Sequence, residues 1–203
     1  MTPRSALDRG LAELDLALAP GAIEKLMRYL ALLEKWNRTY NLTAIRDPLE
    51  MVSHHLLDSL AVVPHLPMAP DAALADVGTG AGLPGIPLAI ARTEWRVTLN
   101  DSNQKKSAFL RQAAIELGLA NVEVHEGRVE SWRPEAAFPL VISRAFASLG
   151  EFIAACRHLV APGGVLAAMT GLAPKGAENA HVIALKVPLL DAQRHLVLAK
   201  VGD

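Results

Sequence analysis

The sequence has one cysteine, little net charge and no long apolar run, and each of these features excludes or disfavours a class of protein. Cys156 is the single cysteine among 203 residues, so an internal disulfide is excluded and a reducing compartment is indicated. The formal net charge of −1 argues against nucleic-acid binding by bulk positive charge, although a local basic patch can still act. The uncharged run from Val77 to Ala91 contains glycine and proline and is too short to cross a bilayer.

Motifs for metal binding and for secretion are also missing. The chain contains no C-x-x-C or H-E-x-x-H pattern and its histidines are scattered, so no metal site is expected. His54 and His55 are adjacent in a predicted helix, where neighbours point in different directions, and we expect them to be packing or surface residues. The N-terminus carries charges every few residues and no apolar core, unlike a signal peptide. We therefore expect a cytoplasmic protein with no membrane partner.

The first seventy residues have a helical pattern. Apolar residues recur at helical spacing between Gly21 and Tyr40, and a second helix is predicted from about Glu50 to Val63. Three prolines then mark a linker, namely Pro64, Pro67 and Pro70. This organisation predicts an N-terminal helical cap over residues 1–70 and a main domain over residues 71–203, together forming one compact unit.

After the linker, short apolar strands alternate with helices. Strands are predicted at residues 73–78, 96–101, 121–127, 139–145 and 165–170, and helices at 85–92, 105–118 and 149–160. Such alternation indicates an α/β fold with a mostly parallel, twisted sheet and helices on both faces. A "PGG" turn is predicted before the last of these strands, and two late apolar runs, residues 184–191 and 194–201, are predicted to pair as an antiparallel hairpin at the sheet edge.

A glycine-rich loop follows the first predicted strand. Gly80, Gly82 and Gly85 form G-x-G-x-x-G, a pattern that is weak alone and fits either NAD or another nucleoside. Asp101, at the end of the next strand, suits a ribose in either case. Asp76, just before the glycines, would repel a pyrophosphate but attract the ammonium and sulfonium charges of S-adenosylmethionine. The order of acid, loop, helix and second acid therefore favours S-adenosylmethionine, while a purely bracing role for Asp76 stays open.

Longer motifs extend this interpretation to nearly the whole chain. They include "YNLTAIRDP", "HLLDSL", "DVGTGAGLPGIPLAI", "LNDSNQKKSAFLRQ", "GRVES" and "VISRAFASL", in that order. In these stretches the chain resembles the ribosomal small-subunit methyltransferase G family, also called glucose-inhibited division protein B. The resemblance implies a Rossmann-like methyltransferase fold, S-adenosylmethionine as donor, and methylation of N7 of one guanine in the 530 loop of 16S ribosomal RNA. Its partner would be that RNA or the small ribosomal subunit.

The resemblance also implies roles for individual residues. Gly78 and Leu83 belong to the methionine side of the donor site. Asp76, Gly80 and Gly82 are expected to bind the donor from the pattern of acid and glycines described above. The ribose is flanked by Asp101, Ser102 and Asn103, and the adenine lies beside Val129 and Glu130. Arg144, at the carboxyl end of a predicted strand, faces both the donor and the acceptor entrance, and is the candidate catalytic residue.

Two positions depart from the family pattern. His54-His55 stands where members often have arginine-histidine, and Thr170-Gly171 stands where they often have lysine-glycine. The first departure removes one fixed positive charge, and the second removes a lysine that could help to hold RNA in the family. Lys105 and Lys106, which open a predicted helix, could contact phosphate, although a solvated pair is the commoner arrangement.

The expected reaction needs little chemistry from side chains. Guanine N7 carries a free lone pair at neutral pH, so no general base is required, and the main task is to align nucleophile, methyl group and sulfur. Two alternatives stay open from the sequence: an NAD-dependent oxidoreductase, which Asp76 disfavours, and an S-adenosylmethionine-binding module without activity. The oligomeric state is not defined by the sequence, and a monomer is the simplest expectation.

Overall fold

The protein is built around one seven-stranded sheet. The computed structural model describes residues 1–144, 146, 148–173 and 180–201. The strand order is β3-β2-β1-β4-β5-β7-β6, with the strands β1 Ala73–Val77, β2 Arg96–Asp101, β3 Val122–Glu126, β4 Phe138–Ser143, β5 Val160–Thr170, β6 Ala180–Leu185 and β7 Arg194–Lys200. Strands β1 to β5 are parallel, and β7 runs antiparallel to both β5 and β6. The predicted α/β fold, mostly parallel with an antiparallel edge, is confirmed.

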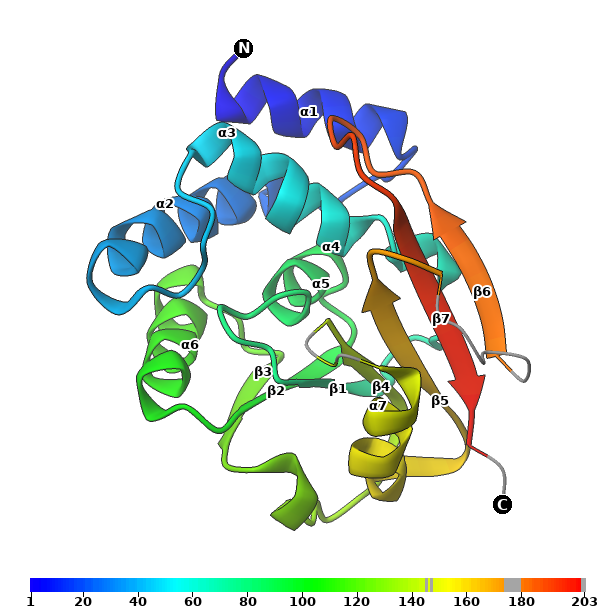
Figure 1. The fold of residues 1–203 in the computed structure, drawn as a ribbon. Helices are drawn as coiled ribbons and strands as arrows, with labels where there is room; N and C mark the ends of the chain where they lie inside the picture. The colour runs from blue at the N-terminus through cyan, green and yellow to red at the C-terminus, as the bar shows by residue number, and fades with distance from the viewer. Residues whose placement is uncertain (145, 147, 174–179, 202–203) are drawn as a thin grey trace.

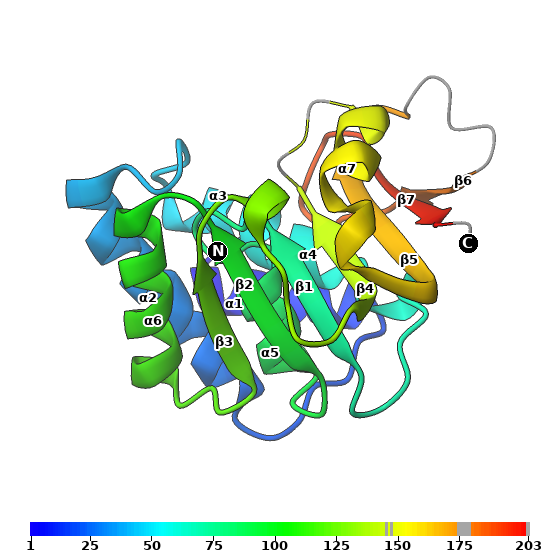
Figure 2. The same cartoon turned by 90° about the horizontal axis from the view of Figure 1, so that it is seen from below.

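Helices cover both faces of the sheet. The longer ones are α1 Pro3–Glu13, α2 Ala22–Tyr40, α5 Gly85–Ala91, α6 Gln104–Leu117 and α7 Leu149–Cys156. The second predicted helix runs as α3 Pro48–Met51, a π-helical stretch η1 Val52–Leu57 and α4 Asp58–Leu60. Short 3₁₀ turns are η2 Val63–His65, η3 Val129–Ser131 and η4 Arg157–Leu159. Helix α7 lies over β4 and β5 (Figure 1), and the view from below shows α1, α2 and α5 behind the sheet, on the face opposite to α7 (Figure 2).

Side-chain alternation along the central strands divides the core into two clusters. Leu74 of β1 packs into the cluster that contains the N-terminal helices, α5 and α6, whereas Ala75 packs into the cluster with Phe152 and Cys156 of α7. Successive residues of a strand point to opposite faces of the sheet, so β1 contributes to both clusters. The N-terminal helices share their core with the sheet, and the boundary between residues 1–70 and 71–203 stays a prediction.

The structure corrects four boundaries. The outer edge strand is β6, residues 180–185, and not residues 184–191; Pro188 has no N–H to donate, and Leu189 has a left-handed backbone with φ of 61°. The predicted "PGG" turn lies inside β5, beside a shift in register against β4 between Phe138 and Leu140. Helix α7 ends at Cys156 rather than at residue 160. Strand β4 ends at Ser143, and the last residue predicted for it, Ala145, lies outside the described residues.

Two further observations complete the fold. Helix α1 was not predicted as a separate element; Thr2 caps it by accepting a hydrogen bond from the Ser5 N–H. Helix α6 ends where expected, because Gly118 adopts the left-handed conformation at its C-terminus. Among the helices that the structure describes, none is both long and apolar enough to cross a membrane.

Candidate functional site

Hydrogen bonds to Asp76, a residue of β1, hold the glycine loop that follows this strand. This side chain is fully buried, and its Oδ2 accepts hydrogen bonds from the Thr79 hydroxyl and from the Gly85 N–H, the latter at 2.7 Å. Burial raises the pKa of Asp76 to about 7, and the two hydrogen bonds and the charge of Arg144 oppose that rise. The carboxyl group thus ties both ends of the loop to the strand, which is the bracing role left open above. Direct contact of Asp76 with a donor stays a prediction.

Two glycines of the loop are required by packing. Gly82 has φ of 89°, and a Cβ added there would lie 2.5 Å from Ile86 Cδ1. A Cβ added at Gly85 would overlap the Leu99 side chain and come within 2.8 Å of Asp76 Oδ2. These positions let α5 approach the sheet closely. The glycine pattern therefore sets the distance between helix and strand as well as the path of the loop.

Asp101 links the glycine loop to the second strand. It is the last residue of β2 and is 6% exposed. Its Oδ2 accepts the Gly80 N–H at 2.9 Å, and its Oδ1 accepts the Asn103 N–H at 2.8 Å. A carboxylate has about four acceptor positions, so these two bonds orient the group and leave it able to accept from hydroxyls of a ligand.

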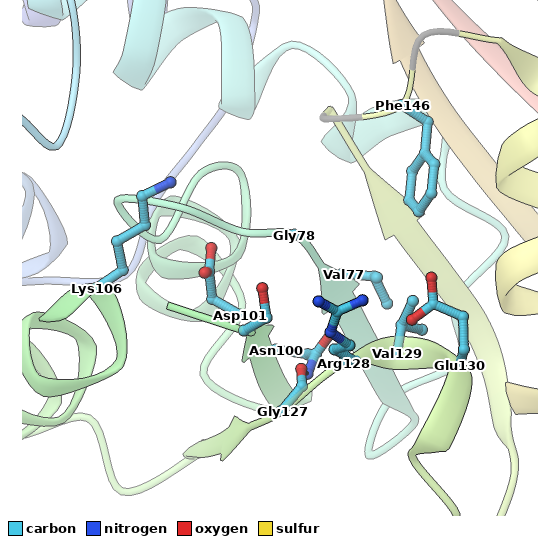
Figure 3. A pocket seen from close by; sticks show the side chains of 11 residues that line it. Val77, Gly78, Asn100, Asp101, Lys106, Gly127, Arg128, Val129, Glu130 and Phe146 are labelled. Carbon is cyan, nitrogen blue, oxygen red and sulfur yellow. The ribbon is translucent and has the colours of Figure 1, made fainter. Parts of the chain in front are cut away.

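A cavity of about 370 Å³ opens beside Asp101 at the carboxyl ends of the strands. Figure 3 shows its wall, which is formed by Val77, Gly78, Asn100, Asp101, Ser102, Lys106, Gly127, Arg128, Val129, Glu130 and Phe146. Five of the predicted donor-site residues are among them: Gly78, Asp101, Ser102, Val129 and Glu130. The structure therefore brings the ends of β1, β2 and β3 around one concave site, which is where ligands bind in open α/β sheets.

The other predicted residues lie away from the wall of this cavity. Gly80 holds Asp101, and Asn103 caps α6 by accepting the N–H groups of Lys105 and Lys106. Leu83 is buried and precedes a cis peptide bond to Pro84. Asp76 and Gly82 lie beneath the loop, as described above. The predicted contacts of these residues with a donor stay predictions.

Several wall residues were not selected from the sequence. Asn100 is buried, and its amide donates to the carbonyls of His125 and Gly127, which fastens the end of β3 to β2. Lys106 extends along the loop: a Cβ added at Gly80 would lie 3.9 Å from its Nζ. The sequence pointed to Lys106 only as one of a lysine pair in the first turn of a helix, three residues after its cap Asn103, and this position could not separate Lys106 from Lys105.

Arg144 lies at a second cavity, of about 390 Å³. Its Nη1 donates to the Asp58 Oδ2 and to the carbonyl of His54, both at 3.0 Å. The cavity is lined by Ile45, His54, His55, Asp58, Arg144, Met169, Thr170, Gly171 and Arg194. Both positions that depart from the family pattern, His54 and Thr170, are on this wall. Asp58 and Arg194 were not predicted from the sequence. They are 86 and 50 residues from Arg144 along the chain, and the fold brings all three to the wall of this cavity.

The two adjacent histidines have different surroundings. His55 is buried, and its Nε2 is 2.9 Å from the Thr43 hydroxyl. Burial, and secondarily the nearby Arg144 charge, lowers the pKa of His55 to about 4, so this ring is neutral at pH 7. His54 is more exposed and lies 3.1 Å from the Glu50 carbonyl through Nδ1. In the part of the chain that the structure describes, no group of three or more potential metal ligands comes together.

Comparisons with known proteins agree with this geometry. A sequence profile described as "rRNA small subunit methyltransferase G" matches residues 22–196. "Ribosomal RNA small subunit methyltransferase G" of Chromobacterium violaceum is 53% identical over 199 residues, which cover 94% of each chain. The protein of the same name from Burkholderia cenocepacia is 50% identical over 209 residues, covering 97% of this chain and 92% of that one. Among solved structures, "a SAM dependent methyltransferase from Aquifex aeolicus" matches with a TM-score of 0.56 and 18% identity over 76% of this chain and 94% of that chain, a likeness of fold.

Proposed function

The chain belongs to the rRNA small subunit methyltransferase G family, and we propose that it transfers a methyl group from S-adenosylmethionine to N7 of one guanine in the 530 loop of 16S ribosomal RNA. The position of Asp101 is the observation that supports this cavity as the donor site. This carboxylate lines the 370 Å³ cavity and accepts a hydrogen bond from the Gly80 N–H of the glycine loop. An oxidoreductase function finds no support in the family or in the comparisons.

The cavity fits the proposed donor in size and in chemistry. Small-molecule sites occupy roughly 300–1,000 Å³, and this cavity is within that range. Asp101 would accept the two ribose hydroxyls, and Val129 and Glu130 would lie beside the adenine. Gly78 would let the backbone approach the methionine part. The donor, when bound, supplies an electrophilic methyl group on a sulfonium.

The reaction forms a bond between guanine N7 and the methyl carbon as the bond from that carbon to sulfur breaks. N7 attacks with a lone pair, so no proton has to leave first and no general base is needed. The contribution of the chain is to hold the reactants in line and to exclude water. Arg144 lines the second cavity, and Phe146, two residues later, lines the 370 Å³ cavity; Arg144 is our candidate for orienting the acceptor.

The acceptor is expected to be structured RNA. The net charge of −1 provides no general attraction for phosphates, so recognition depends on local groups and on RNA shape. Bases in loops can be turned into a pocket, which is how single-stranded RNA targets are usually recognised. A ribosomal particle or folded ribosomal RNA should therefore be a better substrate than a short oligonucleotide. We propose that the protein acts on it as a monomer in the cytoplasm.

A methyl-transfer assay tests the proposal. The protein is incubated with labelled S-adenosylmethionine and small ribosomal subunits that lack the methyl group, and the modified base is mapped by borohydride reduction and aniline cleavage. We expect label at one guanine of the 530 loop. Donor binding without any transfer would favour an inactive binding module. Titration calorimetry that detects NAD binding and no S-adenosylhomocysteine binding would contradict the donor assignment.

A further inference from the structure

Asp58 lies between two arginines that come from distant parts of the chain. Its side chain is 1% exposed. Arg144 Nη1 donates to its Oδ2 and Arg194 Nε donates to its Oδ1, each at 3.0 Å. Arg144 follows β4, and Arg194 opens β7, so one carboxylate joins α4 to two separate strands. Both arginine side chains stay partly exposed, at 28% and 24%, and both line the second cavity.

The π-helical stretch before Asp58 adds a second anchor for Arg144. The Asp58 N–H donates to the carbonyls of Ser53 and His55, while the carbonyl of His54 accepts Arg144 Nη1 at 3.0 Å. Single π-helical turns within helices often occur at functional sites. Both hydrogens of Arg144 Nη1 are thus used within the protein, which leaves little rotational freedom to this guanidinium.

Among the described residues that line this cavity, positive charges exceed negative charges by one. Asp58 is the only acid among the described lining residues, and it faces two arginines. Within the described residues, Arg144 Nε and Nη2 and Arg194 Nη2 donate no hydrogen bond. An arginine presents five donors in a fixed fork that matches the oxygens of a phosphate. The cavity therefore has the charge and the free donors for one phosphate diester.

Resting on the proposed function, we propose that Asp58 is a positioning residue: by fixing Arg144 and Arg194 on the wall of this cavity, it presents their free N–H donors to one phosphate of the target RNA. The buried carboxylate does not itself touch RNA. It sets the spacing and direction of the two guanidinium groups, and so the position at which the RNA strand passes the donor cavity. A phosphate held at this point would place the neighbouring guanine relative to the methyl group.

The Asp58→Asn variant tests this role, because it removes the charge while keeping size and one acceptor oxygen. We expect kcat/KM for methyl transfer to small subunits to fall about ten- to a hundredfold, since a misplacement of about 1 Å can cost roughly a hundredfold. The Kd for S-adenosylhomocysteine should stay within about twofold, as Asp58 is not on the donor cavity. Asp8→Asn is the matched control, because it removes an exposed pair with Arg4; it should leave both quantities unchanged.

A second variant keeps the test independent of folding and of turnover. Arg194→Gln leaves Asp58 paired with Arg144 and should lower the slope of log K against log salt for binding of small subunits by about 1, which is the loss of one phosphate contact. Its control is Arg9→Gln, which removes an exposed pair with Glu13. Two results would overturn the proposal. One is a salt slope for Arg194→Gln that equals that of the wild type. The other is a rate of methyl transfer by Asp58→Asn that falls only in proportion to its folded fraction. Failure of the proposed function is distinct, because the wild-type protein would then bind subunits without methylating them; a wild type that binds no subunits contradicts both.

Discussion

The hydroxyl of Tyr29 in α2 donates a hydrogen bond of 2.7 Å to the carbonyl of Ala81 in the glycine loop. The two residues are 52 positions apart, and the tyrosine ring is fully buried. Helix α2 of the N-terminal part therefore helps to support the glycine loop. The loop is thus held by hydrogen bonds to Asp76 and to Tyr29, a residue of the predicted cap.

Replacing Tyr29 with phenylalanine should weaken both stability and donor binding. The change leaves the Ala81 carbonyl buried without this partner, which costs about 1–3 kcal/mol in the free energy of unfolding. Urea unfolding and calorimetry with S-adenosylhomocysteine measure the two effects. Tyr40→Phe is the control, because Tyr40 is 43% exposed and its change should be neutral. Equal results for the two variants would show that the bond does not support the loop.

Asp101→Ala should reduce the affinity for S-adenosylhomocysteine by roughly ten- to a hundredfold or more. Each charge-assisted hydrogen bond contributes about 1.5–3 kcal/mol, and about 1.4 kcal/mol corresponds to a factor of ten in Kd. The Gly80 N–H also loses its acceptor, so part of the loss comes through the loop. Calorimetry gives the Kd, with Asp191→Ala, at an exposed position, as control. An unchanged Kd for Asp101→Ala would refute the ribose role.

The pH dependence of stability should contain two opposing contributions. The pKa of Asp76 is raised from 3.8 to about 7 in the folded protein, so between these values the folded state binds more protons than the unfolded chain, and stability falls as pH rises. The pKa of His55 is lowered from 6.5 to about 4, so the unfolded chain binds more protons in that range, and stability rises with pH. Between pH 4 and 6.5 the two slopes oppose each other, each limited to about 1.36 kcal/mol per pH unit.

Single variants should separate these slopes. Subtracting the unfolding free energy of Asp76→Asn from that of the wild type should give a difference that falls with pH from about 4 to 7. The same subtraction for His55→Gln should give a difference that rises from about pH 4 to 6.5. Chemical denaturation at half-unit pH steps provides the data. A flat difference for either variant would mean that the group titrates alike in the folded and unfolded chains.

Gly82→Ala should cost more stability than Gly118→Ala. Both glycines have a left-handed backbone, with φ of 89° and 61°, which costs roughly 1–2 kcal/mol for an L-residue. At Gly118 a Cβ meets no atom within 4 Å, whereas at Gly82 it overlaps Ile86, and such overpacking adds about 1–3 kcal/mol. Thermal unfolding of both variants checks the order. Equal losses would mean that Ile86 moves aside without cost.

The sequence predicted most of the sheet because its parallel strands are short apolar runs bounded by turn residues. It also placed Asp101 and Gly78 at one site, since the carboxyl ends of parallel strands lie on the same edge. The burial of Asp76 could not be predicted, because an acid near the end of a strand can face a ligand or the core with the same local pattern. The pairing of Asp58 with Arg144 and Arg194 was also beyond the sequence: it depends on three segments meeting in space. The outer edge strand was misplaced because Leu189 and Leu190 continue the apolar pattern past Pro188, where the strand has already ended.

The position of Arg194 in the last strand has a consequence for synthesis. The chain is synthesised from its N-terminus, so the segments that line the 370 Å³ cavity, the last of which contains Phe146, leave the ribosome before β7. Asp58 and Arg144 are then already present, but the second arginine of the pair is still to be made. Because a domain generally folds as one unit, the second cavity is complete only after β7 has paired with β5. The last strand to be made therefore decides when Asp58 gains the second of its two arginines.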